Sequence, residues 1–136
     1  MLPAFLLAAA LCLFCLPRPA LAVDAWLEEP LAKLQSWNVI SGDTTGNLHL
    51  NSPITRAEFT AMINRAYGYS TRNNIPFTDV ARSAWYSDDI AIGYGTGYFS
   101  GTSATTAEPD ATLTREQAVT LLARNLRFEV RCIWVT

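Results

Sequence analysis

The stretch TRAEFTAMINRAY at residues 55–67 decides the fold, because it carries both a helix start and a helical hydrophobic pattern. Thr55 is an N-cap whose hydroxyl can accept a hydrogen bond from the Glu58 amide, and the Glu58 carboxylate can reach back to the Thr55 amide. Gly68 follows as a C-terminal stop. The sequence therefore predicts a helix that buries one apolar stripe, formed by Phe59, Met62, Ile63, Ala66 and Tyr67.

A shift of 59 residues aligns the chain with itself, which predicts an internal repeat. Matched positions are Ala25-Trp26 with Ala84-Trp85, Ser41-Gly42 with Ser100-Gly101, Thr55-Arg56 with Thr114-Arg115, and Arg65 with Arg124. The second copy has a capping box that uses Gln117, and its apolar stripe is Ala118, Leu121, Leu122, Asn125 and Leu126. We expect two units, residues 23–69 and 77–127, joined by a polar linker at 70–76 and followed by a tail at 128–136.

Each unit is expected to open with a shorter helix, at residues 25–37 and 84–96. In the first of these helices Leu27, Leu31 and Leu34 share a face, and Pro30 fits only in a first turn. A helix pair of this size cannot bury its apolar faces alone, so the second unit must dock on the first. The expected fold class is all-α, with tandem helix-loop-helix repeats.

The first 22 residues indicate a secretory signal peptide. The chain has 136 residues, 50% of them hydrophobic, and from Ala4 to Leu16 every residue is Ala, Phe, Leu or Cys. Cleavage is expected after Ala22, and the apolar run is short for a membrane span, which needs roughly 20 residues. No Lys or Arg precedes the run, so an uncleaved anchor or a misassigned start stays open. After cleavage only Cys132 remains, so no intramolecular disulfide can form.

The residue inventory argues against several classes of function. A formal net charge of −2 makes non-specific nucleic-acid binding unexpected. His49 is the only histidine, and we expect a solvated loop side chain. The adjacent carboxylates Glu28-Glu29 and Asp88-Asp89 lie near helix starts, where the dipole favours them, and are weak candidates for glycoside hydrolysis. We expect no catalytic residue, no cofactor and no metal, because no Cys/His cluster has metal-ligand spacing.

Two arginines directly follow the threonine caps and are the strongest binding candidates. Arg56 and Arg115 each lie in a first helical turn, where the helix dipole disfavours a cation by roughly 0.3–1 kcal/mol. A guanidinium beside exposed first-turn amides can hold a carboxylate or a phosphate with two hydrogen bonds. The alternative is an internal ion pair with Asp79 or Glu58. The residues alone leave both interpretations open.

Aromatic residues at the shorter helices are the second set of candidates. Trp26 and Trp85 head these helices and are either core residues or a face on which sugars stack. Tyr86, Tyr94 and Tyr98 add aromatic surface that suits a glycan and equally suits a core. The sequence does not separate the two roles.

The quoted residues, taken together, resemble an S-layer homology domain. The stretch at residues 54–59, from Ile54 to Phe59, looks like the most recognisable motif of that family. The matching residues of the second unit are Pro76-Phe77-Thr78-Asp79-Val80, Ala84-Trp85-Tyr86, Gly97-Tyr98-Phe99-Ser100-Gly101 and Leu113-Thr114-Arg115-Glu116. The resemblance covers residues 24–127.

This resemblance implies a helical domain, usually of three repeats around a pseudo-threefold axis. It implies non-covalent attachment of secreted bacterial surface proteins to an anionic secondary cell-wall polysaccharide, often carrying ketal-linked pyruvate. Carried over residue by residue, the implied ligand-binding residues are Arg56, Arg115, Trp85, Asp79, Trp26 and Gly101.

The chain departs from the family pattern in several places. The first unit lacks the Phe-x-Asp-Val start, the second motif is Thr-Arg-Glu-Gln, and two units stand where three are usual, which implies an incomplete pseudo-threefold bundle. The tail at 128–136 matches nothing in the family. A truncated or frame-shifted piece of a longer surface protein is therefore one expectation.

The expected function is anchoring at the cell surface or cell wall by binding anionic wall polysaccharide, without catalysis and without a membrane after signal cleavage. One alternative is a module that self-associates as a homo-oligomer or with further repeats, which would fill the missing third position. The other is a wall-associated glycoside hydrolase.

Overall fold

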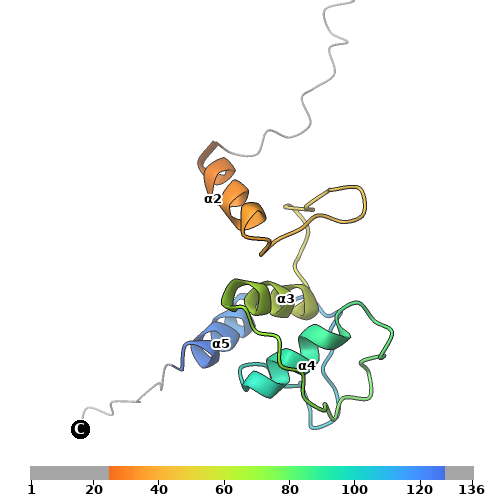
Figure 1. The fold of residues 1–136 in the computed structure, drawn as a ribbon. Coiled ribbons are helices and arrows are strands. Elements are labelled where there is room, and N and C mark those ends of the chain that lie inside the picture. Colours follow the sequence, from red (N-terminus) through yellow and green to blue (C-terminus); the bar gives the residue numbers. More distant parts are fainter. Residues whose placement is uncertain (1–24, 128–136) are drawn as a thin grey trace, which may run out of the picture. The chain divides into compact units, whose positions relative to one another are not determined.

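The computed structural model describes residues 25–127, and this part of the chain is helical. The helices are α2 (Ala25–Ser36), α3 (Arg56–Tyr67), α4 (Ser87–Thr96) and α5 (Arg115–Asn125) (Figure 1). Within residues 25–127 no strand forms, and the extended segments meet only in an isolated antiparallel bridge between Thr55 and Thr112. The expected all-α class is confirmed for these residues. The expected signal peptide at 1–22 and tail at 128–136 lie outside them.

The chain divides into two units, Met1–Lys33 and Leu34–Thr136, with the boundary inside α2. Leu27, Leu31 and Leu34 are half-buried, as their shared face predicted. The prediction for Pro30 was wrong, because this residue lies inside α2 rather than in its first turn and so removes one helix hydrogen bond. None of the helices in the described part combines the length and apolarity that a bilayer span requires.

Both predicted capping boxes form, and they fix where α3 and α5 begin. The Thr55 hydroxyl accepts from the Glu58 amide at 3.2 Å, and the Thr55 amide donates to the Glu58 carboxylate at 2.7 Å. The Thr114 and Gln117 pair repeats this arrangement at 3.2 and 3.1 Å. Gly68 ends α3 in the left-handed conformation, with φ of 68°, as expected.

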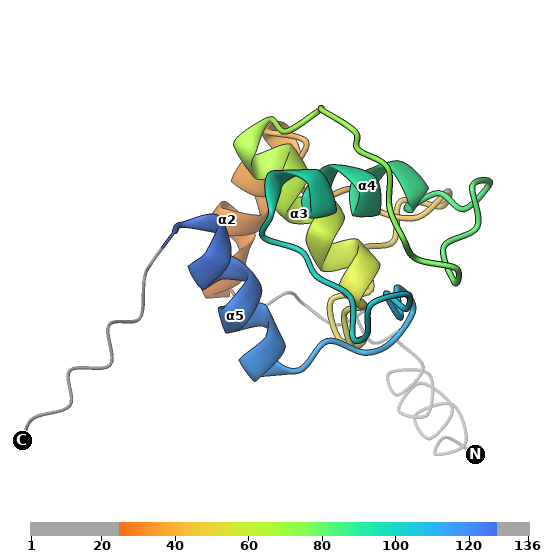
Figure 2. The ribbon, with the colours of Figure 1, turned by 90° about the horizontal axis from the view of Figure 1, so that it is seen from below.

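The buried face of α3 differs from the predicted stripe. Ile63 is buried, but Phe59 and Met62 are half-buried, and Ala66 and Tyr67 are exposed. The helix instead buries a face of small and polar residues, namely Arg56, Ala57, Thr60, Ala61 and Asn64. The reason is that α4 packs closely on Thr60 and Asn64 (Figures 1 and 2), while Arg56 and Ala57 at the start of α3 contact the 107–111 segment.

Glycine at position 93 allows this close packing. A Cβ atom added to Gly93 would lie 2.9 Å from Thr60 Cγ2 and 3.0 Å from the Tyr98 hydroxyl. The buried Tyr98 hydroxyl donates to Asn64 Oδ1 at 2.7 Å, and Asn64 Nδ2 donates to the Asp89 carboxylate at 2.9 Å. This buried polar chain joins α3 to α4. Burial, together with the negative charge of Asp89, raises the pKa of the Tyr98 hydroxyl.

The α4 helix begins later than predicted, at Ser87 rather than at Ala84. Residues 81–86 form turns instead, in which the Ala84 amide donates to the Ala81 carbonyl. Tyr86 occupies the N-cap position and makes no side-chain capping bond, so the acidic pair Asp88-Asp89 in the first turn is the sequence signal near this start. The core beneath these helices is formed by Ala57, Ile63, Phe77, Val80, Tyr86, Ile90, Tyr98, Phe99, Ala107, Leu113 and Leu121.

The predicted stripe of α5 is only partly buried. Leu121 is buried and Ala118 half-buried, whereas Leu122 and Leu126 are exposed. The side-chain amide of Asn125 is buried and has no hydrogen-bond partner. The stripe is therefore buried at Leu121 and only partly covered at the other positions.

Unusual backbone conformations recur at the same 59-residue shift that aligns the sequence with itself. Positive φ angles occur at Asn38 and Gly97, at His49 and Glu108, and at Gly68 and Arg127. Each pair differs by 59 positions. Turn hydrogen bonds recur likewise, since the Ser52 amide donates to the His49 carbonyl and the Ala111 amide to the Glu108 carbonyl.

Residues 70–76, the expected linker, run along α4. The Asn73 amide donates to the Ala91 carbonyl at 3.4 Å, and the Arg72 guanidinium pairs with the Asp88 carboxylate at 2.9 Å. Ile75 is half-buried against the core. These contacts hold the segment against α4 and the core.

Candidate functional site

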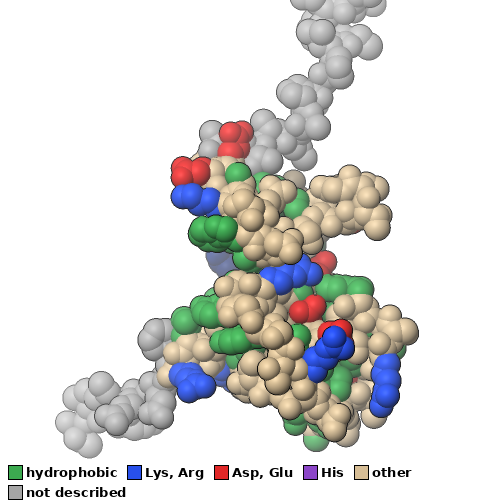
Figure 3. All heavy atoms as spheres, viewed as in Figure 1, with side chains coloured by type: hydrophobic (Ala, Val, Ile, Leu, Met, Phe, Trp, Pro, Cys, Tyr) green, Lys and Arg blue, Asp and Glu red, His purple; other side chains and the backbone are tan. Residues whose placement is uncertain are grey.

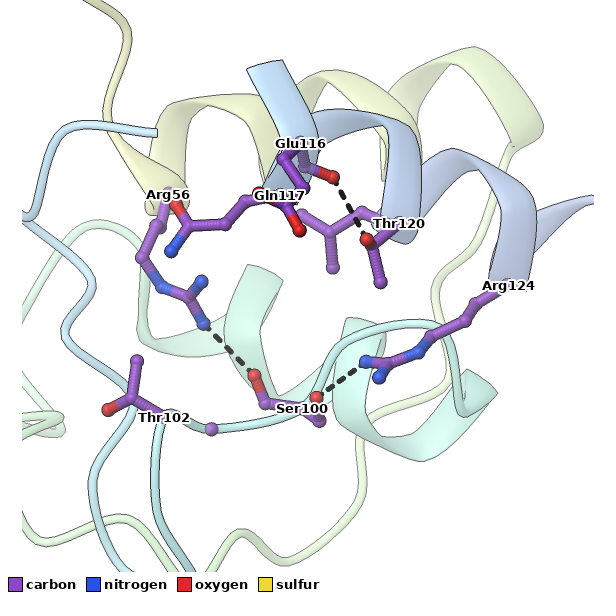
Figure 4. Close-up of a pocket in the computed structure, with 9 residues that line it drawn as sticks. Arg56, Ser100, Thr102, Glu116, Gln117, Thr120 and Arg124 are labelled. Atoms are coloured by element: carbon purple, nitrogen blue, oxygen red, sulfur yellow. Dashed lines mark hydrogen bonds between the residues drawn. The ribbon is translucent and has the colours of Figure 1, made fainter. Parts of the chain in front are cut away.

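A hollow of about 230 Å³ lies between the start of α3, the α5 helix and the loop that follows Phe99. Figure 4 shows its wall, in which two guanidinium groups approach Ser100 from opposite sides. The lining residues are Arg56, Ser100, Gly101, Thr102, Glu116, Gln117, Thr120, Leu121 and Arg124.

Arg56 forms the inner wall of this hollow and is only 5% exposed. Its Nε donates to the Ala107 carbonyl and its Nη2 to the Ser100 carbonyl, both at 3.0 Å, while its guanidinium carbon lies 5.1 Å from the centre of the Phe99 ring. The proposed internal ion pair does not form within residues 25–127, because no acidic group there lies within 4.0 Å of the Arg56 guanidinium, and the side chain is buried rather than exposed. It is held by backbone carbonyls.

The charge on Arg56 is balanced at longer range. Burial lowers the pKa of its guanidinium, and the negative charges of Glu108 and Asp79 act against that shift. An arginine stays protonated in proteins, so Arg56 brings a fixed positive charge to the inner wall.

Arg124 forms the outer wall and is exposed. Its Nη1 donates to the Ser100 hydroxyl at 2.6 Å (Figure 4). Ser100 therefore receives both arginines, Arg56 at its carbonyl and Arg124 at its hydroxyl. Glu116 on α5 supplies a negative charge on the same wall, so the lining side chains carry one net positive charge.

Asp79 and Gly101 shape the loop that carries this hollow. The Asp79 carboxylate accepts from the Ala107 amide at 2.9 Å and from the Glu108 amide at 2.7 Å. Partial burial raises the pKa of Asp79, but these hydrogen bonds and the charge of Arg56 outweigh that effect, so its pKa is lowered. A Cβ atom added to Gly101 would overlap the Thr106 carbonyl and lie 2.6 Å from Phe77 Cε1.

The remaining predicted site residues lie outside the lining of the hollow. Trp85 is 59% exposed and packs edge-on against Tyr86 at 5.4 Å, and Trp26 is 74% exposed. Both tryptophans therefore lie at the surface rather than in the core. Arg115 is also exposed, and among residues 25–127 its side chain has no hydrogen bond or ion pair.

His49 is an exposed loop side chain, as the sequence predicted, and it also contacts an acidic neighbour in its own loop. Its Nε2 lies 2.9 Å from the Asp43 carboxylate in the 43–49 loop. Hydrogen bonds from the Thr45 hydroxyl, the His49 ring and the backbone amides of Thr45 and Asn47 hold the pKa of Asp43 well below its ordinary value. These contacts order the loop. Among residues 25–127, no group of acidic, histidine or cysteine side chains could hold a metal ion.

Sequence reasoning missed Ser100 and Arg124 as members of the site. The match of Arg65 with Arg124, and of Ser41 with Ser100, under the 59-residue shift was the available signal. That signal could not separate the two arginines, because the bond from Arg124 to Ser100 depends on how distant segments fold together. On the face drawn in Figure 3, Lys and Arg side chains stand apart rather than in one basic patch.

Comparison with known proteins places the chain in a family. The sequence model described as the S-layer homology domain matches residues 22–60 and 76–119. The chain is 33% identical over 107 residues to the surface-layer 125 kDa protein of Lysinibacillus sphaericus, covering 79% of this chain and 9% of that protein. It is 29% identical over 119 residues to the surface layer protein of Brevibacillus choshinensis, covering 82% and 11%.

Part of an enzyme is also similar to this chain. The chain is 31% identical over 102 residues to the amylopullulanase of Thermoanaerobacterium thermosulfurigenes, covering 74% of this chain and 5% of that enzyme. The chain thus spans about a tenth or less of the length of these relatives. From the family match and the surface-layer relatives, this chain is a secreted, cell-surface protein of the S-layer homology domain family.

Proposed function

We propose that the chain anchors a surface protein to the cell wall by binding an acidic group of a wall polysaccharide in the hollow at Ser100. The observation that carries this proposal is the approach of Arg56 and Arg124 to one serine in a hollow of about 230 Å³. Ligand pockets for larger molecules measure roughly 300–1,000 Å³, so this one suits a single acidic sugar or a pyruvyl substituent rather than an oligosaccharide.

The two arginines would act differently. Arg56 is fixed by carbonyls and would supply a pre-organised positive charge without moving. Arg124 is exposed, and its guanidinium could turn from the Ser100 hydroxyl to grip a carboxylate with two hydrogen bonds. The Ser100 hydroxyl, released from Arg124, would then donate to the same anion. The acidic side chain of Glu116 would select against ligands carrying many charges.

The other predicted residues would contribute outside the hollow or through its shape. Asp79 and Gly101 would hold the 100–108 loop in its bound form. Arg115, Trp85 and Trp26 are the exposed residues that would contact further sugars of the polymer. Aromatic rings suit the CH-rich faces of sugars, which supports the two tryptophans.

The proposed architecture behind this site is a tandem repeat of residues 23–69 and 77–127. The paired capping boxes and the paired positive φ angles at a 59-residue spacing support it. Local backbone features that recur in one register are expected from duplication of a helix-loop-helix unit.

The test is co-sedimentation of the full chain with purified cell walls. We expect retention on walls that carry the polysaccharide and loss of retention after the polysaccharide is extracted. Arg124→Gln should weaken retention by about tenfold, because a charge-assisted pair is lost. Arg65→Gln is the matched control, since Arg65 holds the same place in the last turn of α3, and it should bind like the unchanged chain.

Two results would overturn the proposal. One is unchanged retention of Arg124→Gln, and the other is equal retention on extracted walls. Release of soluble sugar from the walls by the chain alone would favour the glycoside hydrolase instead. High salt should weaken retention only in part, because a pair within a hollow is screened less than an exposed pair.

A further inference from the structure

We propose that the chain assembles head to tail with a second copy of itself, with the N-terminus of α5 in one copy receiving residues 48–54 of the next. This inference does not depend on the ligand of the Ser100 hollow. It rests on an interface that already exists inside the chain and on two surfaces that match its two halves but have no partner among residues 25–127.

The internal interface joins the N-terminus of α3 to the segment before α5. The Arg56 amide donates to the Ala111 carbonyl at 3.0 Å, and the Ala57 amide donates to the Pro109 carbonyl at 2.9 Å. In return, the Leu113 amide donates to the Ile54 carbonyl at 2.9 Å. These bonds flank the Thr55–Thr112 bridge, so the first free amides of α3 are all satisfied.

The N-terminus of α5 has the same form but lacks this partner. Its cap, Thr114, has φ and ψ of −80° and 158°, close to the −86° and 163° of Thr55. Among residues 25–127, the Arg115 and Glu116 amides and the Leu113 carbonyl make no hydrogen bond. All of Thr114, Arg115 and Glu116 are exposed. These groups correspond, by the 59-residue shift, to those that dock in α3.

The second unpartnered surface is the segment that corresponds to residues 107–113. Under the same shift, Leu50 and Ser52 match Pro109 and Ala111, and Ile54 matches Leu113. The segment has the docking conformation already, since His49 and Glu108 have φ of 49° and 51° and the same turn bond follows each. In the described part of the chain, the Leu50 and Ser52 carbonyls and the Ile54 amide have no partner.

The two surfaces therefore complement each other as donors and acceptors. Arg115 and Glu116 amides would donate to the Ser52 and Leu50 carbonyls of the second copy, and its Ile54 amide would donate to the Leu113 carbonyl. Exposed apolar side chains lie near both surfaces, Leu50 on the segment and Val119 about one turn into α5. A contact of this heterologous kind leaves one free end on each side, so it generates rings or filaments.

The sharpest test is a disulfide across the new bridge. Pro53 and Thr114 occupy the positions that match Thr112 and Thr55, and Thr55 and Thr112 form a non-hydrogen-bonded pair, whose short separation suits a disulfide. In a chain with Cys12, Cys15 and Cys132 replaced by serine, we mix Pro53→Cys with Thr114→Cys and oxidise. We expect the mixed disulfide dimer to dominate over both homodimers. As a control for the geometry, Thr55→Cys with Thr112→Cys in one chain should close an intramolecular disulfide.

A second variant tests the contact without cysteines. Arg115→Pro removes the amide donor at the first helical position, where proline is tolerated, and Thr114 already has the extended backbone that precedes proline. Sedimentation equilibrium should show concentration-dependent association of the unchanged chain and about tenfold weaker association of Arg115→Pro, with equal helical content. A monomeric unchanged chain at millimolar concentration, equal association of the variant, or a random mixture of disulfides would each overturn the proposal.

Discussion

The N-termini of α3 and α5 carry the same Thr-Arg start and the same capping box, yet their surroundings differ completely. At α3, Arg56 is buried and the free amides donate to carbonyls of the 109–111 segment. At α5, Arg115 and the corresponding amides are exposed. The comparison shows that a local motif sets where a helix begins, while the role of its arginine is set by which segment docks beside it.

The largest difference between the two starts should appear in stability. Arg56→Ala removes two hydrogen bonds from a charged group to buried carbonyls and should lower the free energy of unfolding by about 3 kcal/mol. Arg115→Ala, at an exposed position, should change it by less than about 0.5 kcal/mol. Urea unfolding followed by circular dichroism measures both. Equal effects would contradict the comparison.

The buried hydrogen bonds that join α3 to α4 through Tyr98 and Asn64 should have the second largest effect on stability. Tyr98→Phe leaves Asn64 Oδ1 buried without its donor and should destabilise the fold by about 2 kcal/mol. Tyr69→Phe is the matched control, because Tyr69 is half-buried and stacks on Tyr98, while its hydroxyl makes no hydrogen bond within residues 25–127. A loss in the control as large as in Tyr98→Phe would remove the argument.

Removing the two helix caps should change the free energy of unfolding by smaller amounts, and by different amounts for α3 and α5. Thr55→Ala should cost about 1 kcal/mol of global stability, because α3 lies at the centre of the core. Thr114→Ala should cost less in global unfolding, since Leu121 is the one residue between Arg115 and Asn125 that is buried, and the helix can fray alone. Hydrogen exchange of the two helices distinguishes these cases. Faster exchange confined to α3 in the Thr114→Ala variant would contradict this expectation.

The smallest expected effect is a pH-dependent change in stability when Asp79, which holds the 107–108 amides, is replaced. The pKa of Asp79 is lowered in the folded chain, so its carboxylate stabilises the fold above the ordinary value near pH 3.9, and that contribution is lost as the pH falls through the folded pKa. Asp79→Asn should be less stable than the unchanged chain at pH 7 and should approach it near pH 2. Asp88→Asn, at an exposed ion pair, serves as control. A gap for Asp79→Asn that stays constant with pH would rule out this role.

Local features of the fold could be predicted from the sequence, whereas features set by distant segments could not. The caps of α3 and α5 involve residues three apart, so the sequence contains the whole interaction. Which face of α3 is buried depends on where α4 packs. The close approach of α4 buries Thr60 and Asn64, two polar residues that a search for apolar stripes passes over. The late start of α4 has no capping side chain that could announce it.

The residues of the candidate site likewise differ in how far they could be predicted from local sequence. Arg56 was identified as a special residue from its place after the cap, but its burial depends on Ser100 and Ala107, which lie 44 and 51 positions away. Arg124 was seen only as a repeat identity, because its bond to Ser100 joins residues 24 positions apart. Spacing alone could not bring these groups to one hollow.

The most direct measurement of the central claim is nitrogen-15 NMR of the chain titrated with purified acidic wall polysaccharide. We expect the largest shifts at the amides of Ser100, Gly101 and Thr102 and at the side-chain Nε–H groups of Arg56 and Arg124. Shifts confined to other surfaces, such as the 43–49 loop, or no shifts at saturating polymer, would contradict it.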